Sequence, residues 1–411
     1  MEITENKRFD IIVVGGGIVG LASAYKLNLK YPILKILVLE KESSVASHQT
    51  GHNSGVIHSG LYYKPGSYKA KNCVDGRREL VQFARDNNIP HDICGKVVVA
   101  TDKLELPHMG RVFENGIKNG VEGIEKITSD RIREIEPFCE GIEGIWVPCT
   151  GIIDYADVAK KYVELIHQKF SGSRVVTERE VIGFEQFEDH TLVKCKSDLY
   201  EARFVINCSG LQSDRVAKME GVKPDMQIVG FRGDYYELSE SGMDKVRNLI
   251  YPVPNPQFPF LGVHFTRMIK GGVECGPNAV FVFKREGYRK TDFSFRDSIQ
   301  ALSYKGTWNL FFKHWRFGLD EYKRAFSKRL FLNRLKKMIP SLEMSDIVPG
   351  RAGVRAMALG ADGEMIDDFK IEHHHNALHV LNAPSPAATA SLAIGTAICE
   401  MASDKFNLKA S

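Results

Sequence analysis

The sequence has few cysteines, and no pattern ties them together. Its eight cysteines include no C-x-x-C pair, which disfavours a zinc knuckle or a disulfide framework. Free thiols are typical of proteins in a reducing compartment. No apolar run approaches the roughly 18 residues that a membrane-spanning helix needs. The first ten residues, MEITENKRFD, lack the features of a signal or transit peptide. We therefore expect a cytoplasmic protein.

The chain also lacks an excess of charge of one sign. Its 55 basic and 51 acidic residues leave a net charge of +4, which disfavours a general nucleic-acid-binding protein. No segment repeats at a fixed period. A hydrophobic share of 43% with 26% charged residues is typical of a globular chain, and 411 residues are enough for two domains.

What the chain does have is a complete G-x-G-x-x-G motif near its N-terminus. Gly15, Gly17 and Gly20 follow the apolar residues 11–14 and precede an apolar segment, residues 21–29. Gly15 permits the tight strand-to-helix turn, Gly17 lets the backbone approach a pyrophosphate, and Gly20 lets the helix lie close to the strand. The N-terminus of the helix then offers free N–H groups to phosphate.

An acidic residue stands at the expected distance from this motif. Residues 35–40 are expected to form a second strand, and Glu40 lies at its end, 20 positions after Gly20. A carboxylate at this position accepts hydrogen bonds from the ribose hydroxyls of a dinucleotide. The stretch therefore predicts a dinucleotide site.

A loop rich in Ser, His and Gly follows this strand, at residues 43–60. It contains His48, His52 and His58, but no paired carboxylate or cysteine ligands accompany them in the sequence. A metal site is therefore disfavoured. The loop returns to the C-terminal edge of the sheet, where ligands bind in doubly wound folds. We interpret it as a loop that faces the bound cofactor.

The remaining periodicity predicts alternating helices and strands. Asp154 is expected to cap an amphipathic helix, and residues 202–210 read as an apolar strand that ends in small residues. The other expected elements are a helix over 68–87, strands over 96–100, 174–177, 180–184, 191–195 and 377–381, and a helix over 387–401.

Four stretches together resemble a known superfamily: GGGIVG with Glu40, TGHNSGVIHSG, VINCSG and LNAPSPAATAS. They are similar to the D-amino-acid-oxidase-like FAD-dependent oxidoreductases. Within that superfamily, HNSGVIHSG, RGDYYEL, PFLGVHFTR and LNAPSPAATAS resemble the L-2-hydroxyglutarate dehydrogenase/oxidase family. The resemblance covers essentially the whole chain. It implies FAD as cofactor, a 2-hydroxy acid as substrate and a 2-oxo acid as product.

The expected fold class is α/β, with a Rossmann-like FAD-binding domain interleaved with a substrate domain on a mixed or antiparallel sheet. The FAD-binding domain is assigned residues 1–85, 150–225 and 345–411. The substrate domain is assigned residues 86–149 and 226–344. The site should lie between the two.

The predicted FAD-binding residues come from the glycine motif, the second strand, the histidine-containing loop, the middle strands and the start of the last helix. They are Gly15, Gly17, Gly20, Glu40, Asn53, Ser54, Val181, Gly210, Ala387, Ala388 and Thr389. A positive helix end at Ala387 would stabilise the anionic charge on reduced flavin.

Oxidation of a 2-hydroxy acid by flavin requires a base for the hydroxyl proton and cations for carboxylates. His264 is the preferred base, although a histidine of a half-buried strand is also a common core residue, and His58 is the rival. Arg355 is the preferred carboxylate clamp because guanidinium is a planar bidentate fork. Weaker candidates for substrate contact are Arg351, Arg267, Tyr235 and Tyr236, of which Arg351 and Tyr236 complete the predicted substrate-binding set.

The expected reaction is oxidation of L-2-hydroxyglutarate to 2-oxoglutarate, with electrons passed to quinone or oxygen. Two alternatives remain open: a flavin oxidase of glycine or sarcosine type, and a non-catalytic flavin-binding or scaffold protein. A covalent flavin link at His52 is also open, since His52 lies three residues before Gly55 as the flavin-linked histidine does in the dimethylglycine-dehydrogenase branch.

Residues 304–337 depart from the balanced charge of the chain. They contain ten basic and two acidic residues, a local net of +8, and nine aromatic residues that include Trp308 and Trp315. This composition favours contact with an anionic membrane surface, such as the cytoplasmic face of the inner membrane. The alternative is a solvated basic face over a buried aromatic side.

Overall fold

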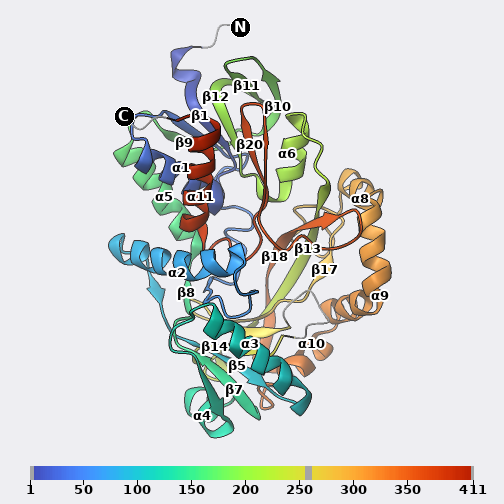
Figure 1. Cartoon of the computed structure of the whole chain (residues 1–411). Helices are drawn as coiled ribbons and strands as arrows, with labels where there is room; N and C mark the ends of the chain where they lie inside the picture. The colour runs from blue at the N-terminus through green and yellow to red at the C-terminus, as the bar shows by residue number, and fades with distance from the viewer. Residues whose placement is uncertain (1–3, 255–261, 409–411) are drawn as a thin grey trace.

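The computed structural model describes residues 4–254 and 262–408, and two large sheets organise it (Figure 1). The first sheet lies in the upper half of Figure 1 and carries the glycine motif. Its strands are β10 (Val181–Gln186), β11 (Thr191–Cys195), β12 (Leu199–Asn207), β1 (Arg8–Val14), β2 (Ile36–Leu39) and β9 (Arg174–Val176), continued beyond β12 by β20 (Ala377–Asn382) and β19 (Lys370–His374). Strands β20, β12, β1, β2 and β9 are parallel, as in a Rossmann-like sheet.

Apolar runs explain why this sheet is buried on both faces. Ile11, Ile12 and Val13 of β1 are all fully buried, which is the pattern of a parallel strand covered on each side. Helices α1 (Ile18–Lys30), α5 (Tyr155–Lys169) and α11 (Ser391–Lys405) pack beside it. Figure 1 shows the first and last helices, in blue and red, side by side, so the two ends of the chain build one unit.

The second sheet is mixed and mostly antiparallel, as expected. Its strands are β17 (Val280–Phe281), β13 (Met226–Leu238), β16 (Val273–Gly276), β15 (His264–Arg267), β14 (Leu249–Pro252), β5 (Lys96–Ala100), β7 (Glu143–Val147) and β6 (Glu125–Thr128), with β18 (Ile347–Gly360) paired to β13. Only β14 and β5 are parallel neighbours among the described pairs.

Strand β18 belongs to this second sheet, although the predicted domain boundary near residue 345 placed it with the first. It pairs with β13 along most of its length, from Ile347 opposite Leu238 to Gly360 opposite Met226. Long-range antiparallel pairing, which leaves no local signature in the sequence, decides where this segment lies. The division into domains otherwise stays a prediction.

The remaining elements cap the sheets. The small sheet consists of β3 (Val56–Ile57), β8 (Gly151–Ile153) and β4 (His91–Asp92). The other helices are α2 (Tyr68–Asp86), α3 (Leu106–Lys118), α4 (Ser129–Ile135), α6 (Ser213–Met219), α7 (Glu240–Met243), α8 (Phe295–Leu302), α9 (Lys305–Phe326) and α10 (Lys328–Leu335). Within the described residues, none of the helices combines the length and the apolar character needed to span a bilayer.

Candidate active site

The glycine motif forms the turn between β1 and α1. Gly15 has a φ of +111°, which favours glycine, and a Cβ there would lie 2.6 Å from the carbonyl oxygen of Cys208. A Cβ on Gly20 would collide with the carbonyl of Gly15. Both glycines are therefore required for the close packing of helix on strand.

Gly17 has a different environment. It precedes Ile18, the first residue of α1, and the nearest described atom to a Cβ on Gly17 would be the Thr50 hydroxyl oxygen, 3.5 Å away. That hydroxyl accepts a hydrogen bond from the Ile18 N–H at 3.0 Å, so the histidine-containing loop packs on the first turn of the helix. The room beside Gly17 is what close approach of a phosphate requires.

Glu40 follows directly after β2 and its carboxylate is almost fully buried. One oxygen accepts the Gly16 N–H at 2.8 Å and the other accepts the Glu42 N–H at 2.9 Å. A Cβ on Gly16 would lie 2.9 Å from the Cβ of Glu40. The middle glycine of GGG, which the motif does not single out, therefore allows the acidic residue to approach the turn.

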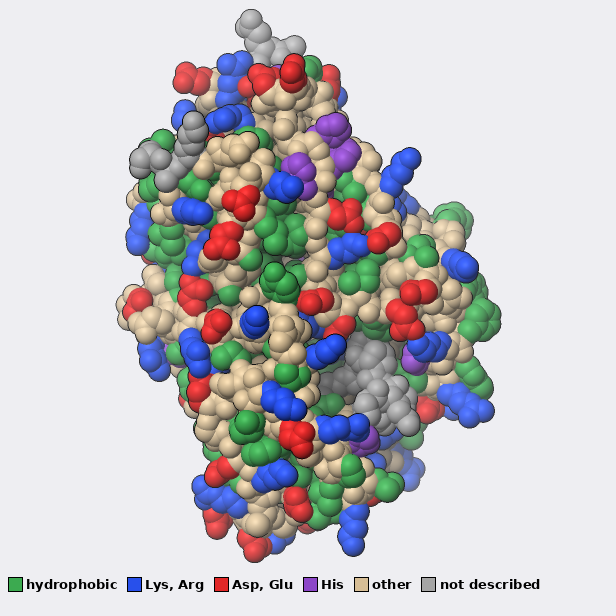
Figure 2. Space-filling view, viewed as in Figure 1, with side chains coloured by type: hydrophobic (Ala, Val, Ile, Leu, Met, Phe, Trp, Pro, Cys, Tyr) green, Lys and Arg blue, Asp and Glu red, His purple; other side chains and the backbone are tan. Residues whose placement is uncertain are grey.

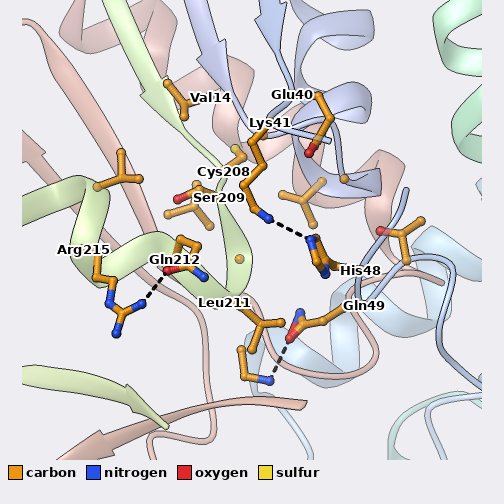
Figure 3. A pocket seen from close by; sticks show the side chains of 18 of the residues that line it. Val14, Glu40, Lys41, His48, Gln49, Cys208, Ser209, Leu211, Gln212 and Arg215 are labelled. Atoms are coloured by element: carbon orange, nitrogen blue, oxygen red, sulfur yellow. Dashed lines mark hydrogen bonds between the residues drawn. The ribbon is translucent and has the colours of Figure 1, made fainter. Parts of the chain in front are cut away.

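A cavity of about 610 Å³ opens where β1, β2 and β12 end (Figure 3). Ligands of open parallel sheets bind at this edge. In Figure 3, Val14, Glu40 and Cys208 come from these strand ends. Seven predicted FAD-binding residues line the cavity: Gly15, Gly17, Glu40, Val181, Gly210, Ala387 and Ala388.

The other four are not among the described wall residues: Gly20, Asn53, Ser54 and Thr389. The Asn53 amide donates to the carbonyl oxygens of Gln49 and Thr50, at 3.0 and 2.6 Å, and so shapes the loop. The Thr389 hydroxyl accepts the His58 N–H at 3.1 Å. The side chains of Asn53 and Thr389 therefore hold the segments around the cavity together. The spacing of a sequence motif cannot distinguish this structural role from contact with a ligand.

The last helix begins later than predicted. Helix α11 starts at Ser391, and residues 387–390 form a turn in which Ala387 N–H donates to Pro384 and Ala390 N–H to Pro386. The expected helix end at Ala387 is therefore wrong. Alanine is a strong helix former, so the residue types at 387–390 did not reveal where the helix begins. The backbone hydrogen bonds of the turn delay the start of α11 to Ser391.

A network on the cavity wall includes residues that sequence reasoning did not assign to the site. The Lys41 ammonium lies 2.9 Å from His48 Nε2 (Figure 3). It also lies 3.0 Å from a Glu286 carboxylate oxygen and pairs with Glu42. A ring nitrogen of His48 and carboxylate oxygens of Glu42 and Glu286 lie within 4.8 Å of one another, so His48 does have carboxylate neighbours. Lys41 supplies the positive charge among them. Glu286 is 245 positions from Lys41, and no sequence signal could have found it.

Both predicted bases and the predicted clamp meet at the second sheet. We call His58, Lys96, Tyr251, His264 and Arg355 the histidine cluster. His264 interacts electrostatically with Lys96 and Arg355, and His58 interacts with Lys96 and His264. The His264 ring stacks on Tyr251 with centroids 4.0 Å apart. The cluster gathers residues from the histidine-containing loop, β5, β14, β15 and β18.

His264 is held as a neutral imidazole. Its Nδ1 lies 2.9 Å from the Gly262 carbonyl oxygen and donates to it, which leaves Nε2 as an acceptor. Burial, with the positive charges of Arg355 and Lys96, lowers the pKa of His264 to about 3. Burial, with Lys96 and then His264, lowers the pKa of His58 to about 3 as well. Both rings are therefore uncharged near pH 7, the form that accepts a proton.

Arg351 and Arg267 are committed to other partners. Arg351 pairs with buried Glu274 and donates to the Asn53 carbonyl at 2.7 Å, so it ties the histidine-containing loop to β18 and β16. Arg267 pairs with Asp92. Arg355 stays the candidate clamp because it interacts electrostatically with His264 and Tyr235.

Tyr236, predicted to contact substrate, lies on the wrong side of β13. Its ring packs on Phe331 of α10, with centroids 4.7 Å apart, inside a core cluster. The preceding Tyr235 interacts electrostatically with Arg355, and burial raises its pKa. Successive side chains of a strand point to opposite faces. The pairing of β13 with β18 also shifts register between Asp234 and Tyr236, which the sequence did not reveal.

A family model described as FAD dependent oxidoreductase, DAO, matches residues 10–401. The chain belongs to the FAD-dependent oxidoreductase family. This confirms the predictions of an FAD cofactor and of an oxidoreductase with a Rossmann-like unit.

Curated relatives extend over nearly the whole chain. It is 49% identical over 399 residues to an L-2-hydroxyglutarate dehydrogenase of Indibacter alkaliphilus, covering 97% of this chain and 100% of the relative. It is 44% identical to the enzyme of that name from Escherichia coli strain K12, covering 95% and 92%. Identity to the human mitochondrial L-2-hydroxyglutarate dehydrogenase is 43%, covering 97% and 90%.

Solved structures show the same fold at low identity. L-alpha-glycerophosphate oxidase from Mycoplasma pneumoniae with FAD bound superposes with a TM-score of 0.79 at 22% identity, covering 98% of this chain and 95% of the other. Glycine oxidase from Geobacillus kaustophilus has a TM-score of 0.73 at 14% identity, covering 97% and 95%.

The residues of the cavity fit FAD. The N-terminus of α1 and the open space beside Gly17 suit a pyrophosphate, and the carboxylate of Glu40 stands at the end of β2 for a ribose. Ala387 and Ala388 line the wall from the C-terminal segment. Gly15 to Gly20 and Glu40 would therefore hold the adenosine diphosphate part of the cofactor.

Proposed function

We propose that this protein oxidises L-2-hydroxyglutarate to 2-oxoglutarate. The observation that carries the proposal is the histidine cluster, in which the neutral imidazole of His264 interacts with the Arg355 cation. An alcohol that bears carboxylates needs both groups: a base for its hydroxyl proton and a cation for its negative charge. Relatives at 43 to 49% identity that are named L-2-hydroxyglutarate dehydrogenase support this acid as the substrate.

Each protein group has a defined task in this reaction. FAD, when bound, supplies the acceptor for the hydride of the alcohol carbon. Arg355 holds a substrate carboxylate, and His264 Nε2 takes the hydroxyl proton. His58 is the second candidate for that proton. Burial is the main cause of the low pKa of His264, and bound carboxylates would offset the smaller contribution of the two cations, so the base strengthens in part when substrate is present.

Anaerobic flavin reduction tests the function. We expect L-2-hydroxyglutarate to bleach the flavin much faster than D-2-hydroxyglutarate, L-lactate, glycine or sarcosine. Faster bleaching by glycine or sarcosine would make the protein an amine oxidase. No bleaching by any compound of the panel would favour a non-catalytic flavin-binding protein.

A surface feature bears on the electron acceptor. We call residues 304–337, which contain α9 and α10, the basic-aromatic segment. Several of its aromatic side chains are exposed, so they do not all form a buried side. Phe312 is 74% exposed, Trp315 is 55% exposed, and Trp308 and Phe326 are also exposed. Figure 2 shows hydrophobic and basic side chains intermingled along the right-hand edge, where Figure 1 places α8 and α9.

This segment supports docking on an anionic membrane, such as the cytoplasmic face of the inner membrane, with electrons passed to quinone. Each basic side chain near an anionic surface contributes about 1 kcal/mol, and aromatic rings settle at headgroup depth. Flotation with anionic liposomes should recover the protein at low salt and lose it at high salt. Phe312→Ser with Trp315→Ser should reduce recovery.

The control for flotation is Leu104→Ser, because Leu104 is 80% exposed but lies outside the basic-aromatic segment. Absence from the lipid fraction at both salt concentrations would oppose docking and favour oxygen as the acceptor. Equal losses for the control and the double variant would show that the segment has no special role.

The attachment of flavin is a separate question. His52 Nδ1 lies 3.0 Å from the Ala352 carbonyl oxygen, and its ring lies 4.3 Å from that of Tyr288. A covalent link at His52 would therefore use Nε2. Acid precipitation distinguishes the two cases, because a colourless pellet excludes the link and a yellow pellet supports it.

A further inference from the structure

Lys96 is a buried cation with no role in the proposed proton transfer. It lies on β5, between β14 and β7, and is only 1% exposed. Burial lowers the pKa of Lys96 to about 8. A buried ammonium is costly unless an anion or hydrogen-bond acceptors compensate it.

The neighbours of Lys96 in the described residues do not provide a carboxylate. Its ammonium lies 4.6 Å from the ring centroid of Tyr62 and 5.0 Å from that of Tyr251, and it forms no ion pair with a described Asp or Glu. Burial raises the pKa of the nearby Cys73 thiol to about 12 and also raises the pKa of Cys149, so both thiols are uncharged. The faces of aromatic rings attract a cation but do not neutralise it.

The hydroxyl of Tyr62 adds a second unmatched group. Its oxygen is buried and has no hydrogen-bond partner among the residues that the structure describes. Buried polar atoms in folded proteins nearly always have a partner. The Lys96 ammonium lies over the ring that carries this hydroxyl, and an ammonium and a phenolic hydroxyl on neighbouring side chains can both donate to one carboxylate.

The position of Lys96 relative to the base indicates which ligand it serves. His264 interacts electrostatically with both Lys96 and Arg355, so the proposed base has two cations in its surroundings. Neither Arg355 nor Lys96 is among the described wall residues of the FAD cavity, but Arg355 directly precedes Ala356, which lines it. On that ground we take Arg355 as the pole nearer the cofactor.

We infer that Lys96, with the Tyr62 hydroxyl, binds the carboxylate farthest from the reacting carbon, while Arg355 binds the carboxylate beside it. This assignment rests on the proposed function. Two cations then match two carboxylates, and a monocarboxylic acid of the same length leaves Lys96 uncompensated. Lys96 is thus a specificity-determining residue for dicarboxylates.

The test compares L-2-hydroxyglutarate with L-2-hydroxyvalerate, which has a methyl group in place of the far carboxylate. Stopped-flow flavin reduction of the holoenzyme gives kcat/KM for each acid. We expect Lys96→Met to lower the preference for L-2-hydroxyglutarate by roughly 30-fold or more, mainly through KM. Lys96→Arg, which keeps the charge, should retain more of the preference. Glutarate, titrated by its perturbation of the flavin spectrum, should bind Lys96→Met more weakly by a similar factor.

Tyr62→Phe provides an independent variant if Lys96→Met does not fold. It removes one hydroxyl and should lower the preference by about 3- to 10-fold, the usual worth of one hydrogen bond. An unchanged preference in the variants, or equal losses with both acids, would overturn the role of Lys96. A wild-type holoenzyme that reduces its flavin with L-2-hydroxyvalerate but not with L-2-hydroxyglutarate would overturn the proposed function itself.

Discussion

The glycine turn and the histidine cluster are built in different ways. The turn uses consecutive residues of one βα unit, and its geometry is set by backbone: a positive φ at Gly15 and contact between Gly20 and Gly15. The histidine cluster uses side chains from the loop at His58, from β5, β14, β15 and β18, up to about 300 positions apart. A local motif predicts the first kind of site, whereas only sheet pairing assembles the second.

The two regions also differ in how they treat charge. The turn offers N–H groups and a buried carboxylate whose oxygens are already hydrogen-bonded. The histidine cluster gathers Lys96 and Arg355 around His264, whose pKa is lowered by burial and, to a smaller extent, by these two cations. In the first arrangement, the backbone already balances the carboxylate through two hydrogen bonds. The second places two cations near the neutral imidazole of His264, which is typical of a site for an anionic ligand.

The largest expected effect is at the turn. Gly17→Val should leave the fold intact, because the nearest described atom to its Cβ is 3.5 Å away, but should crowd the pyrophosphate and yield colourless protein. Absorbance at flavin wavelengths and circular dichroism measure both outcomes. Gly183→Ala is the control, since a Cβ there meets no described atom within 4 Å. A fully yellow Gly17→Val protein would contradict the placement of FAD.

The next effect concerns the base. His264→Asn should slow flavin reduction by roughly 10²–10⁴-fold, the usual worth of a positioned proton acceptor. His58→Asn serves as the matched comparison from the same cluster. If His58→Asn slows reduction more than His264→Asn does, the proton-accepting role passes to His58.

Removal of the clamp should come third. Arg355→Ala should cost about 2–5 kcal/mol, mostly in substrate binding, because a buried carboxylate loses its cation. Arg351→Ala should instead lower the midpoint of urea unfolding, since buried Glu274 loses its partner. Comparable increases in KM for both variants would mean that Arg355 is not a distinct clamp.

The smallest effect is the pH dependence of stability. The pKa of His264 is about 3 when folded and about 6.5 when unfolded, so between these values the unfolded chain binds more protons. Stability is therefore lost as pH falls from 6.5 toward 3, by up to about 1.4 kcal/mol per pH unit from this residue.

Urea unfolding at pH 7, 6 and 5 with excess FAD measures that slope. His264→Asn should reduce the slope by about 1 kcal/mol per pH unit, whatever it does to stability at pH 7. A slope identical to that of the wild type would show that His264 is not held neutral by the fold.

The elements predicted correctly are those whose residues strongly favour a single conformation. The helix over 68–87, the cap at Asp154 and the strand over 96–100 are present as α2, α5 with its Asp154 cap, and β5. Sequence reasoning failed where several conformations suit the same residues. Ala387 reads as helical but lies in a turn, and Tyr236 reads as part of the site but packs on Phe331.

By itself, the sequence determined the parallel sheet and the dinucleotide turn, because apolar periodicity and glycine φ preferences act over a few neighbouring residues. Only the tertiary structure decided that β18 joins the second sheet, that Arg351 forms an ion pair with Glu274, and that Lys96 interacts with His264. Pairing register and burial set these contacts, and both depend on segments that lie far apart in the sequence. For that reason the cofactor site could be predicted from the motif, while the substrate site required the fold.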